Sequence, residues 1–379
     1  MKNTSSITSY VLLVLLTFSG SCTSKNNKSV FFTIDVNSAK EQSISLSKIT
    51  EKIEAIELEM TENSLIAARS IRRVLYTGEH IIVCEISKVM LFDNSGKFIR
   101  QIGSRGQGPG EFTSIFDITA DIINNHIYII TASDNRIICY DFAGKFIKEN
   151  NLTKGGVRYI NYINNNLLYL VRVNETVNRE GILRTFLLTV DNNLLESDSL
   201  EVNKTFTHVG HISFFTTGKN DYISYDGENT FLYSGNELSE TILDTLYQIK
   251  NKQLLPYLKL KFDEEDYKNR TLVEDMQNRN KLPSEIDRIL KLENIYKSSG
   301  YVFSIFSQRN ISYSFYYDIK TGESYKAKDG YTDDIHTNEI VKIRPFDFDA
   351  NMFYYMHTRI DDTMKDEPNP TLYIGTLKK

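Results

Sequence analysis

Cysteine, proline and surplus positive charge are all scarce in this sequence, and two of these scarcities exclude a class of protein. The 379 residues contain three cysteines, Cys22, Cys84 and Cys139, which are too few for the disulfide framework of small secreted domains. The 44 lysines and arginines are outnumbered by 49 aspartates and glutamates, so no basic excess exists to neutralise a row of phosphates. We therefore expect no nucleic-acid partner.

Aromatic and β-branched residues are plentiful, whereas proline occurs only 6 times. The sequence has 23 tyrosines and 21 phenylalanines, together with many isoleucines and valines, and these residues suit a pleated, half-buried surface. Strands are therefore the expected element. Cys84 and Cys139 lie within apolar strand-like runs, where a thiol stays protonated and inert.

A long hydrophobic run is also missing, because the longest apolar stretch covers only residues 10–18. These roughly nine residues are far short of the 20 or so that span a bilayer as a helix. They follow the positively charged Lys2 and precede the small residues Ser19, Gly20 and Ser21. We interpret residues 1–22 as an export signal.

The small residues before Cys22 resemble the lipobox of bacterial lipoproteins, in which the cysteine thiol receives a diacylglyceryl group. Ser19 replaces the usual leucine three positions before the cysteine, so simple signal cleavage stays open as the alternative. Residues 23–42 begin with a polar stretch rich in Ser, Asn and Lys, which predicts a flexible tether. No acidic pair follows Cys22, which favours the periplasmic side of the envelope over the cell surface.

An internal repeat decides the predicted fold. Residues 89–99 recur as residues 137–147, and both copies end in D-x-x-G-K-F-I, with Asp93 and Asp141 48 positions apart. Each copy reads as a strand, a tight turn in which glycine supplies a positive φ, and a second strand. Weaker copies occur at residues 187–193, 247–251, 316–322 and 371–377.

Six such units predict an all-β fold, a six-bladed β-propeller spanning residues 43–379, because units of this size bury their faces only by stacking. The last copy ends the chain without an outermost strand. The early strand at residues 52–59 is expected to complete it and close the ring, which would remove an exposed sheet edge.

Residues 91–112, LFDNSGKFIRQIGSRGQGPGEF, are similar to the NHL-type repeat and closely resemble a family of six-bladed-propeller lipoproteins of Gram-negative envelopes. Residues 46–59, 244–247 and 369–373 match the same family. The resemblance implies a propeller located at the envelope, but it carries over no catalytic residues.

Between the fourth and fifth copies the repeat spacing stretches, and residues 263–297 predict a helical insertion. Four acidic residues at 263–266 suit a helix N-terminus, and the apolar residues Ile286, Ile289, Leu290 and Ile295 recur at roughly helical spacing. A helix packed on a blade edge is the simpler interpretation, and a lid or partner-docking element is the alternative.

Candidate chemistry in the sequence is sparse. The glycine-rich residues 103–110 lack the G-K-[ST] ending of a phosphate-binding loop and include Pro109, so an inter-blade connection is favoured. His208 and His211 are followed by a strand-like run and do not predict a metal site. No G-x-S-x-G motif occurs, and we predict no catalytic residue, no metal and no cofactor.

The inner strands of a propeller line a central channel, and in five of the units we expect one residue each on this face. Cationic residues around a channel mouth would suit an anionic or carbohydrate-derived ligand, with Arg105 on its rim, whereas ordinary surface ion pairs are the alternative. The candidate channel-face residues are Arg72, Arg105, Asp117, Arg158, His211 and Arg344.

Two functions from different classes follow from this architecture. The first is a non-catalytic binding or scaffolding module, anchored to the membrane by its lipid, that binds an envelope protein or a saccharide. The alternative is a propeller enzyme, such as a lactonase, lyase or glycan-active hydrolase, that holds a metal in its channel.

Overall fold

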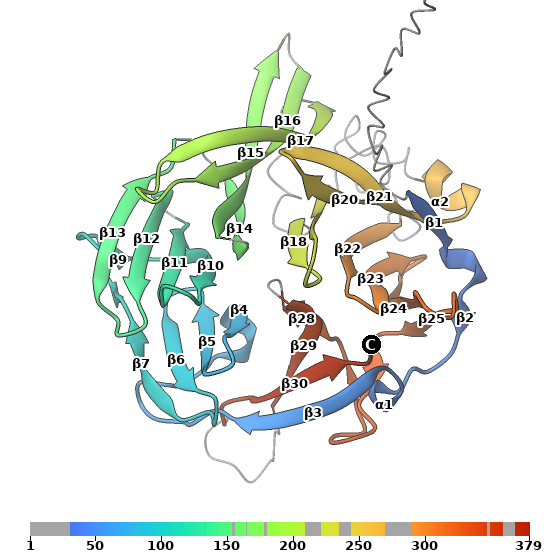
Figure 1. The fold of residues 1–379 in the computed structure, drawn as a ribbon, viewed down its shortest axis with the longest axis horizontal. Helices are drawn as coiled ribbons and strands as arrows, with labels where there is room; N and C mark the ends of the chain where they lie inside the picture. The colour runs from blue at the N-terminus through green and yellow to red at the C-terminus, as the bar shows by residue number, and fades with distance from the viewer. Residues whose placement is uncertain are drawn as a thin grey trace, which may run out of the picture.

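The computed structural model describes residues 31–379 except 133, 154–155, 164, 178–179, 209–220, 235–243, 270–289, 347–348 and 359–367. Its strands form six main sheets of four or five strands, arranged around a central axis as the blades of a propeller (Figure 1). The predicted all-β, six-bladed β-propeller is confirmed.

The first three blades are four-stranded antiparallel meanders in which the chain runs from the inner strand to the outer strand. Blade 1 contains β4 (Ile71–Tyr76), β5 (His80–Glu85), β6 (Val89–Asp93) and β7 (Phe98–Ile102). Blade 2 contains β10 (Ile115–Asp121), β11 (His126–Thr131), β12 (Arg136–Asp141) and β13 (Phe146–Asn151). Blade 3 contains β14 (Val157–Ile163), β15 (Asn166–Val177), β16 (Glu180–Val190) and β17 (Glu196–His208).

The last three blades each include a strand from the N-terminal part of the chain. Blade 4 contains β18 (Asp221–Tyr225), β19 (Thr230–Ser234), β20 (Thr245–Lys250), β21 (Gln253–Lys261) and β1 (Phe32–Asp35). Blade 5 contains β22 (Lys291–Lys297), β23 (Tyr301–Gln308), β24 (Ile311–Asp318), β25 (Ser324–Lys328) and β2 (Lys40–Glu41). Blade 6 contains β28 (Arg344–Phe346), β29 (Asp349–His357), β30 (Thr371–Leu377) and β3 (Thr50–Glu57).

Short elements connect the blades. A two-stranded parallel pair lies between blades 1 and 2, and a two-stranded antiparallel pair lies between blades 5 and 6. These are β8 (Ser104–Arg105) with β9 (Glu111–Phe112), and β26 (Tyr331–Thr332) with β27 (Ile340–Val341). The short helices of the described residues are η1 (Val36–Ser38), α1 (Leu46–Ile49), η2 (Ala68–Ser70) and α2 (Glu264–Asn269).

All six copies of the sequence repeat fall on the third strand of a blade, which explains why they were recognisable. In the two clearest copies, the aspartate Oδ1 accepts hydrogen bonds from the turn, at 3.0 Å from Lys97 N to Asp93 and at 2.8 Å from Lys145 N to Asp141. Gly96 and Gly144 have φ of 90° and 77°, which favours glycine at this position.

Among the described residues the buried apolar side chains form six clusters, one for each pair of neighbouring blades. Strand β5 shows how the sequence supplies two of them. Ile82 and Cys84 face blade 2, whereas Ile81 and Val83 face blade 6. Because side chains alternate across a strand, a blade with buried faces on both sides needs a continuous apolar run.

Strand β3 closes the ring, as predicted from residues 52–59. It pairs antiparallel with the C-terminal strand β30, from Thr50 opposite Leu377 to Glu57 opposite Thr371. Ile56 and Leu58 are buried in the cluster between blades 6 and 1. The early strand β3 and the C-terminal strand β30 therefore lie side by side in one sheet (Figure 1).

The segment predicted as a tether, residues 23–42, is attached to the propeller over its described part. Strand β1 pairs parallel with β21 on the outer edge of blade 4, and β2 pairs parallel with β25 on blade 5. Ile34 and Val36 are only 4% and 2% exposed, so burial of these side chains holds the segment in place. Cys22 and residues 1–30 lie outside the described residues.

The predicted helical insertion at residues 263–297 is helical only in α2 among its described residues. Residues 291–297 form β22, the inner strand of blade 5, and Ile295 packs in the core between blades 4 and 5. A helix buries apolar residues three or four positions apart, and a strand that is covered on both faces can bury residues at the same spacing. The apolar spacing of this segment therefore fits both elements, which explains why the prediction of a helix differs from the observed strand.

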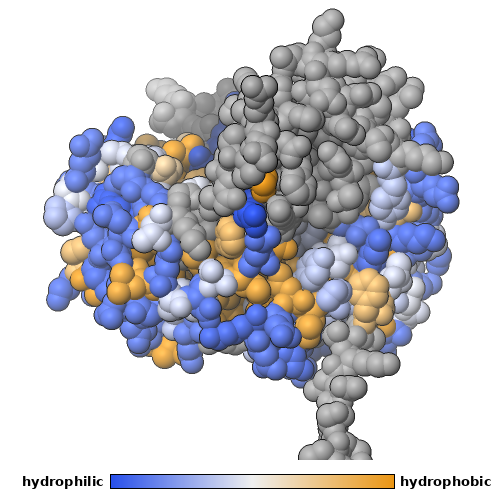
Figure 2. All heavy atoms as spheres, turned by 90° about the horizontal axis from the view of Figure 1, so that it is seen from above, coloured by the Kyte–Doolittle hydropathy of each residue, from blue (hydrophilic) through white to orange (hydrophobic). Residues whose placement is uncertain are grey.

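Hydrophilic residues cover most of the described surface on the side seen in Figure 2, and hydrophobic residues gather in its middle. Among the helices of the described residues, none has the length and apolar character needed to cross a membrane.

Candidate functional site

A cavity of about 260 Å³ lies where the inner strands begin, and it is lined by residues from five of the six blades. Four cationic and two anionic side chains line it, together with three tyrosines from blades 3, 5 and 6. The charged residues are Arg72, Arg73, Lys342, Arg344, Asp117 and Glu293, and the tyrosines are Tyr159, Tyr296 and Tyr354. We call this space the axial cavity.

Three of the six candidate residues chosen from the sequence, Arg72, Asp117 and Arg344, line the axial cavity. Arg158 lies on the inner strand β14, but the structure does not describe its side chain. His211 lies outside the described residues.

Arg105 is not at the axial cavity. It is exposed on β8, in the connection between the outer strand of blade 1 and the inner strand of blade 2. The prediction that residues 103–110 form an inter-blade connection is therefore confirmed. Glu111 Oε2 accepts a hydrogen bond of 2.9 Å from Gly108 N, so a carboxylate of the chain itself binds an amide of this loop.

A recurring bulge positions the side chains at the cavity. In β4, β10, β14 and β22 the pairing with the next strand skips one residue near the strand's start. The skipped residues are Arg72, Phe116, Arg158 and Glu293. A bulge bends its strand and redirects side chains, and bulges occur often next to functional sites.

Arg73 is the centre of a buried network that joins blades 1, 2 and 3. Its Nη1 donates to Asp117 Oδ2 at 3.0 Å and to the carbonyl oxygens of Ile118 and Ile160 at 2.6 Å each. Its guanidinium lies 4.7 Å from the centre of the Tyr159 ring. Asp117 Oδ2 also accepts a hydrogen bond from Ile160 N at 3.1 Å. Arg73 and Asp117 therefore neutralise each other inside the wall.

The remaining charges of the cavity are more accessible. Lys342 and Arg344 are exposed, and Arg72 and Glu293 are half-buried. Lys342 Nζ lies 3.1 Å from Ser312 Oγ, to which it donates a hydrogen bond. With the Arg73–Asp117 pair neutral, cations outnumber anions, and a cavity with low-dielectric walls strengthens their attraction for an anion.

Sequence reasoning missed Arg73, Tyr159, Glu293 and Lys342. Arg73 is adjacent to the predicted Arg72, and neighbouring residues of a regular strand point to opposite faces. The bulge brings both to the cavity, and no residue pattern in a single blade signals it. An alignment of the six units, strand by strand, would have placed Glu293 at the position equivalent to Arg72.

The described residues contain no group of three or more His, Cys, Asp or Glu side chains arranged to hold a metal ion. The alternative of a propeller enzyme with a channel metal therefore finds no support in this part of the chain. Cys84 and Cys139 are both buried, and burial raises the pKa of the Cys139 thiol to about 11.

Comparisons with known proteins agree with the architecture. The sequence matches the family described as "Domain of unknown function (DUF4934)" over residues 31–375. No curated protein matches it. Among solved structures, a protein of Bacteroides fragilis NCTC 9343 that is described as exported has a TM-score of 0.65 at 16% identity, covering 92% of this chain and 100% of that chain.

A member of the DUF4221 family from Bacteroides vulgatus is similar with a TM-score of 0.46 at 10% identity, covering 87% of this chain and 97% of that chain. The likeness to the Bacteroides fragilis protein, at 16% identity, shows the fold alone, so function is argued from the site.

Proposed function

Since the chain belongs to the DUF4934 family, a domain of unknown function, we propose its role from its own geometry: it is a non-catalytic binding module that recognises an acidic saccharide at the axial cavity. The observation that carries this proposal is the lining of that cavity, in which the cationic residues Arg72, Lys342 and Arg344 accompany three tyrosines.

The chemistry of the lining suits a sugar carboxylate. An arginine guanidinium matches a carboxylate in a two-pronged hydrogen-bonded pair, and such charge-assisted bonds are about twice as strong as neutral ones. A tyrosine ring offers an apolar face for the C–H face of a sugar and a hydroxyl for hydrogen bonding. Arg344 supplies the guanidinium from blade 6, and Tyr354, opposite it on the neighbouring strand, is 7% exposed with its ring stacked on Phe346, so it can add little more than its hydroxyl.

The size of the cavity favours a saccharide over a protein segment. Its volume of about 260 Å³ lies just below the roughly 300–1,000 Å³ of typical small-ligand pockets. That space holds about one acidic sugar unit of a longer chain. An interface between folded proteins instead buries about 800 Å² on each partner.

Calorimetric titration with oligogalacturonate, and with the neutral galactose oligomer as a comparison, tests the proposal. We expect the acidic oligomer to bind and the neutral one not to bind at this cavity. Arg72→Ala and Arg344→Ala should each weaken binding by about tenfold or more, because each removes a charged hydrogen-bond donor. Added salt should weaken binding further.

Arg105→Ala is the matched control, since Arg105 is an exposed arginine of the same molecule that lies away from the cavity. It should leave binding unchanged. Binding that persists in Arg72→Ala and Arg344→Ala, or an equal effect of Arg105→Ala, would contradict the assignment. Capture of an envelope protein that depends on Arg72 and Arg344 would identify a protein ligand instead.

The proposal includes a place in the cell. The signal-like residues 1–22 and the lipobox-like Cys22 support export and lipid anchoring at the bacterial envelope, on the periplasmic side. The similar Bacteroides fragilis protein, described as exported, is consistent with this. The D-x-x-G-K-F-I hairpins of blades 1 and 2 support an NHL-like repeat.

Metabolic labelling with a clickable fatty acid tests the anchor. The natural protein should incorporate the label and fractionate with membranes, whereas Cys22→Ser should lose the label and appear in the soluble fraction. Cys84→Ser should behave as the natural protein does, because Cys84 is buried in blade 1. If the natural protein does not incorporate the label, lipid anchoring at Cys22 is wrong, and the proposal is reduced to export with simple cleavage of the signal.

A further inference from the structure

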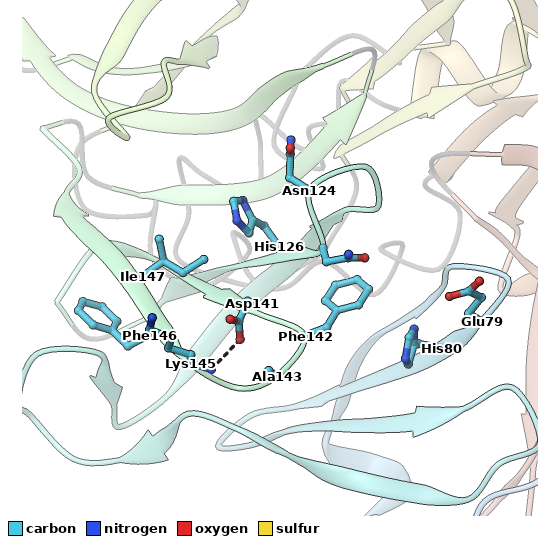
Figure 3. A pocket seen from close by; sticks show the side chains of 11 residues that line it. Glu79, His80, Asn124, His126, Asp141, Phe142, Ala143, Lys145, Phe146 and Ile147 are labelled. Atoms are coloured by element: carbon cyan, nitrogen blue, oxygen red, sulfur yellow. Dashed lines mark hydrogen bonds between the residues drawn. The ribbon is translucent and has the colours of Figure 1, made fainter.

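A second pocket, larger than the axial cavity, lies at the opposite ends of the inner strands. It has a volume of about 710 Å³ and is formed by blades 1 and 2. Its walls are the turn before β5, the turn between β10 and β11, and the turn between β12 and β13 (Figure 3). We call it the turn pocket.

The polar residues of the turn pocket differ in kind from those of the axial cavity. Two histidines, His80 and His126, occupy the same position, the first residue of the second strand, in blades 1 and 2. Glu79 and Asp141 are balanced in part by Lys145. The lining therefore has no cationic excess and offers little attraction for an anion.

Several of these polar groups are uncommitted. The imidazoles of His80 and His126 and the side-chain amide of Asn125 make no hydrogen bond with any residue that the structure describes. Each of these groups can donate as well as accept, and each is planar. A ligand that presents several hydroxyl groups could pair with them together.

The frame that holds these groups is fixed by hydrogen bonds between the turns. Phe142 N donates to the carbonyl of Asn125 at 3.0 Å and thereby ties two turns of blade 2 together. Asp141 Oδ1 accepts from Lys145 N at 2.8 Å within the third turn. A rigid frame lowers the ordering cost when a ligand binds.

Two aromatic rings add an apolar surface. Phe142 packs against the His80 ring with centroids 5.3 Å apart, and Phe146 lines the same pocket at 37% exposure (Figure 3). A sugar ring combines hydroxyl groups with an apolar C–H face, so it complements a lining of phenyl rings, amides and imidazoles.

We infer that the turn pocket is a second binding site, specific for a neutral saccharide, on the face of the propeller opposite the axial cavity. The near balance of charge excludes the acidic ligand proposed for the axial cavity. The two sites would let one molecule engage two regions of a glycan, or two glycans, at once.

Ligand-observed NMR followed by calorimetry tests the inference, with full-length protein in a detergent that has no sugar headgroup. The probes are neutral oligosaccharides of glucose, galactose, mannose and N-acetylglucosamine. We expect at least one to bind. His126→Ala and Asn125→Gly should each weaken that binding about fivefold to tenfold, which is the usual range for one ligand hydrogen bond.

Asn125→Gly suits the test because Asn125 has φ of 55°, which glycine adopts without strain. Asn165→Gly is the matched control, since Asn165 has φ of 60° in the corresponding turn of blade 3 and is outside the pocket. The control should bind as the natural protein does, and thermal unfolding should show that all variants are folded.

Three results would overturn the inference. These are the absence of binding by every probe at millimolar concentration, binding that His126→Ala and Asn125→Gly leave unchanged, and loss of neutral-saccharide binding in Arg72→Ala. The last result would move the neutral ligand to the axial cavity. Failure of the acidic oligomer to bind would leave the turn pocket unaffected, so the two assignments are tested separately.

Discussion

Arg73 illustrates how single residues combine stability and site geometry in this protein. Its side chain is 7% exposed, its partner Asp117 is fully buried, and their network links three blades beside the axial cavity. Removing one member of a buried ion pair leaves an uncompensated charge, which costs about 3–5 kcal/mol. Arg73→Met should lower the free energy of unfolding by that amount in urea denaturation.

The exposed ion pair between Lys52 and Glu54 provides the comparison. Its N–O distance of 2.7 Å is shorter than the 3.0 Å of the buried pair, yet its side chains are 64% and 53% exposed. Solvent screens such a pair. Lys52→Met should leave the urea midpoint unchanged, and an equal loss in both variants would show that burial does not matter at Arg73.

Asp266 gives the protein a predictable pH response. Burial raises the pKa of its carboxyl to about 6, whereas an aspartate in an unfolded chain titrates near 4. Between these values the folded state binds more protons, so the free energy of unfolding contributed by this group falls as the pH rises from about 4 to 6.

Asp266→Asn removes this titration while keeping an acceptor for Gln308 Nε2, which lies 2.6 Å from Asp266 Oδ2. The variant should gain about 1–2 kcal/mol relative to the natural protein between pH 4.5 and pH 7, after allowance for screening. Urea unfolding at both pH values measures the difference. Parallel pH profiles of the two proteins would contradict the expectation.

At the residue scale, the sequence predicted only part of the cavity. Arg72, Asp117 and Arg344 were chosen because inner strands line a propeller channel, and the structure places all three there. Arg73 and Glu293 were missed because a bulge changes which face a side chain occupies. Hydrogen-bond pairing between strands determines the bulge, and single-strand periodicity does not record it.

Strand β30 shows how tightly the elements pack. Gly375 pairs with Phe353 on one side and with Ile53 on the other, and a Cβ built on it would lie 2.1 Å from Cζ of the Phe353 ring. Gly375→Ala should therefore destabilise the protein by about 1–3 kcal/mol, the usual cost of overpacking a core.

The Phe353→Leu background separates this clash from a backbone effect. A smaller side chain at position 353 makes room for the added methyl group, so Gly375→Ala should cost clearly less there than in the natural protein. Urea unfolding of the four proteins of the double-mutant cycle gives the coupling. Equal costs in both backgrounds would show that Phe353 is not the obstacle.

At the element scale, periodic strands were predictable and short aperiodic ones were not. The six repeat copies and the closing strand at residues 52–59 follow from apolar alternation and turn glycines. Strands β1 and β2 pair in parallel with strands more than 200 residues away. β1 lies in the apolar run VFFTIDV at residues 30–36, which the prediction of a tether overlooked, whereas β2 lies in a polar stretch where no local pattern shows it.

Closure of the ring is a property of the whole molecule, and it makes the last testable prediction. Without β3, β30 becomes an open edge and the cluster between blades 6 and 1 loses Ile56 and Leu58. An unpaired apolar edge promotes aggregation. A chain that begins at residue 60 should therefore aggregate or lose its cooperative unfolding transition.

A chain that begins at residue 43 retains β3 and, of the elements that the structure describes, loses β1, η1 and β2. It should unfold in one cooperative transition, at a lower temperature than the full chain, because Ile34 and Val36 no longer cover the core between blades 4 and 5. A synthetic peptide of residues 43–60, which carries β3, should restore the solubility of the chain that begins at residue 60. If the chain from residue 60 instead melts at the same temperature as the chain from residue 43, β3 does not hold the ring together, and the contacts between blades are sufficient by themselves.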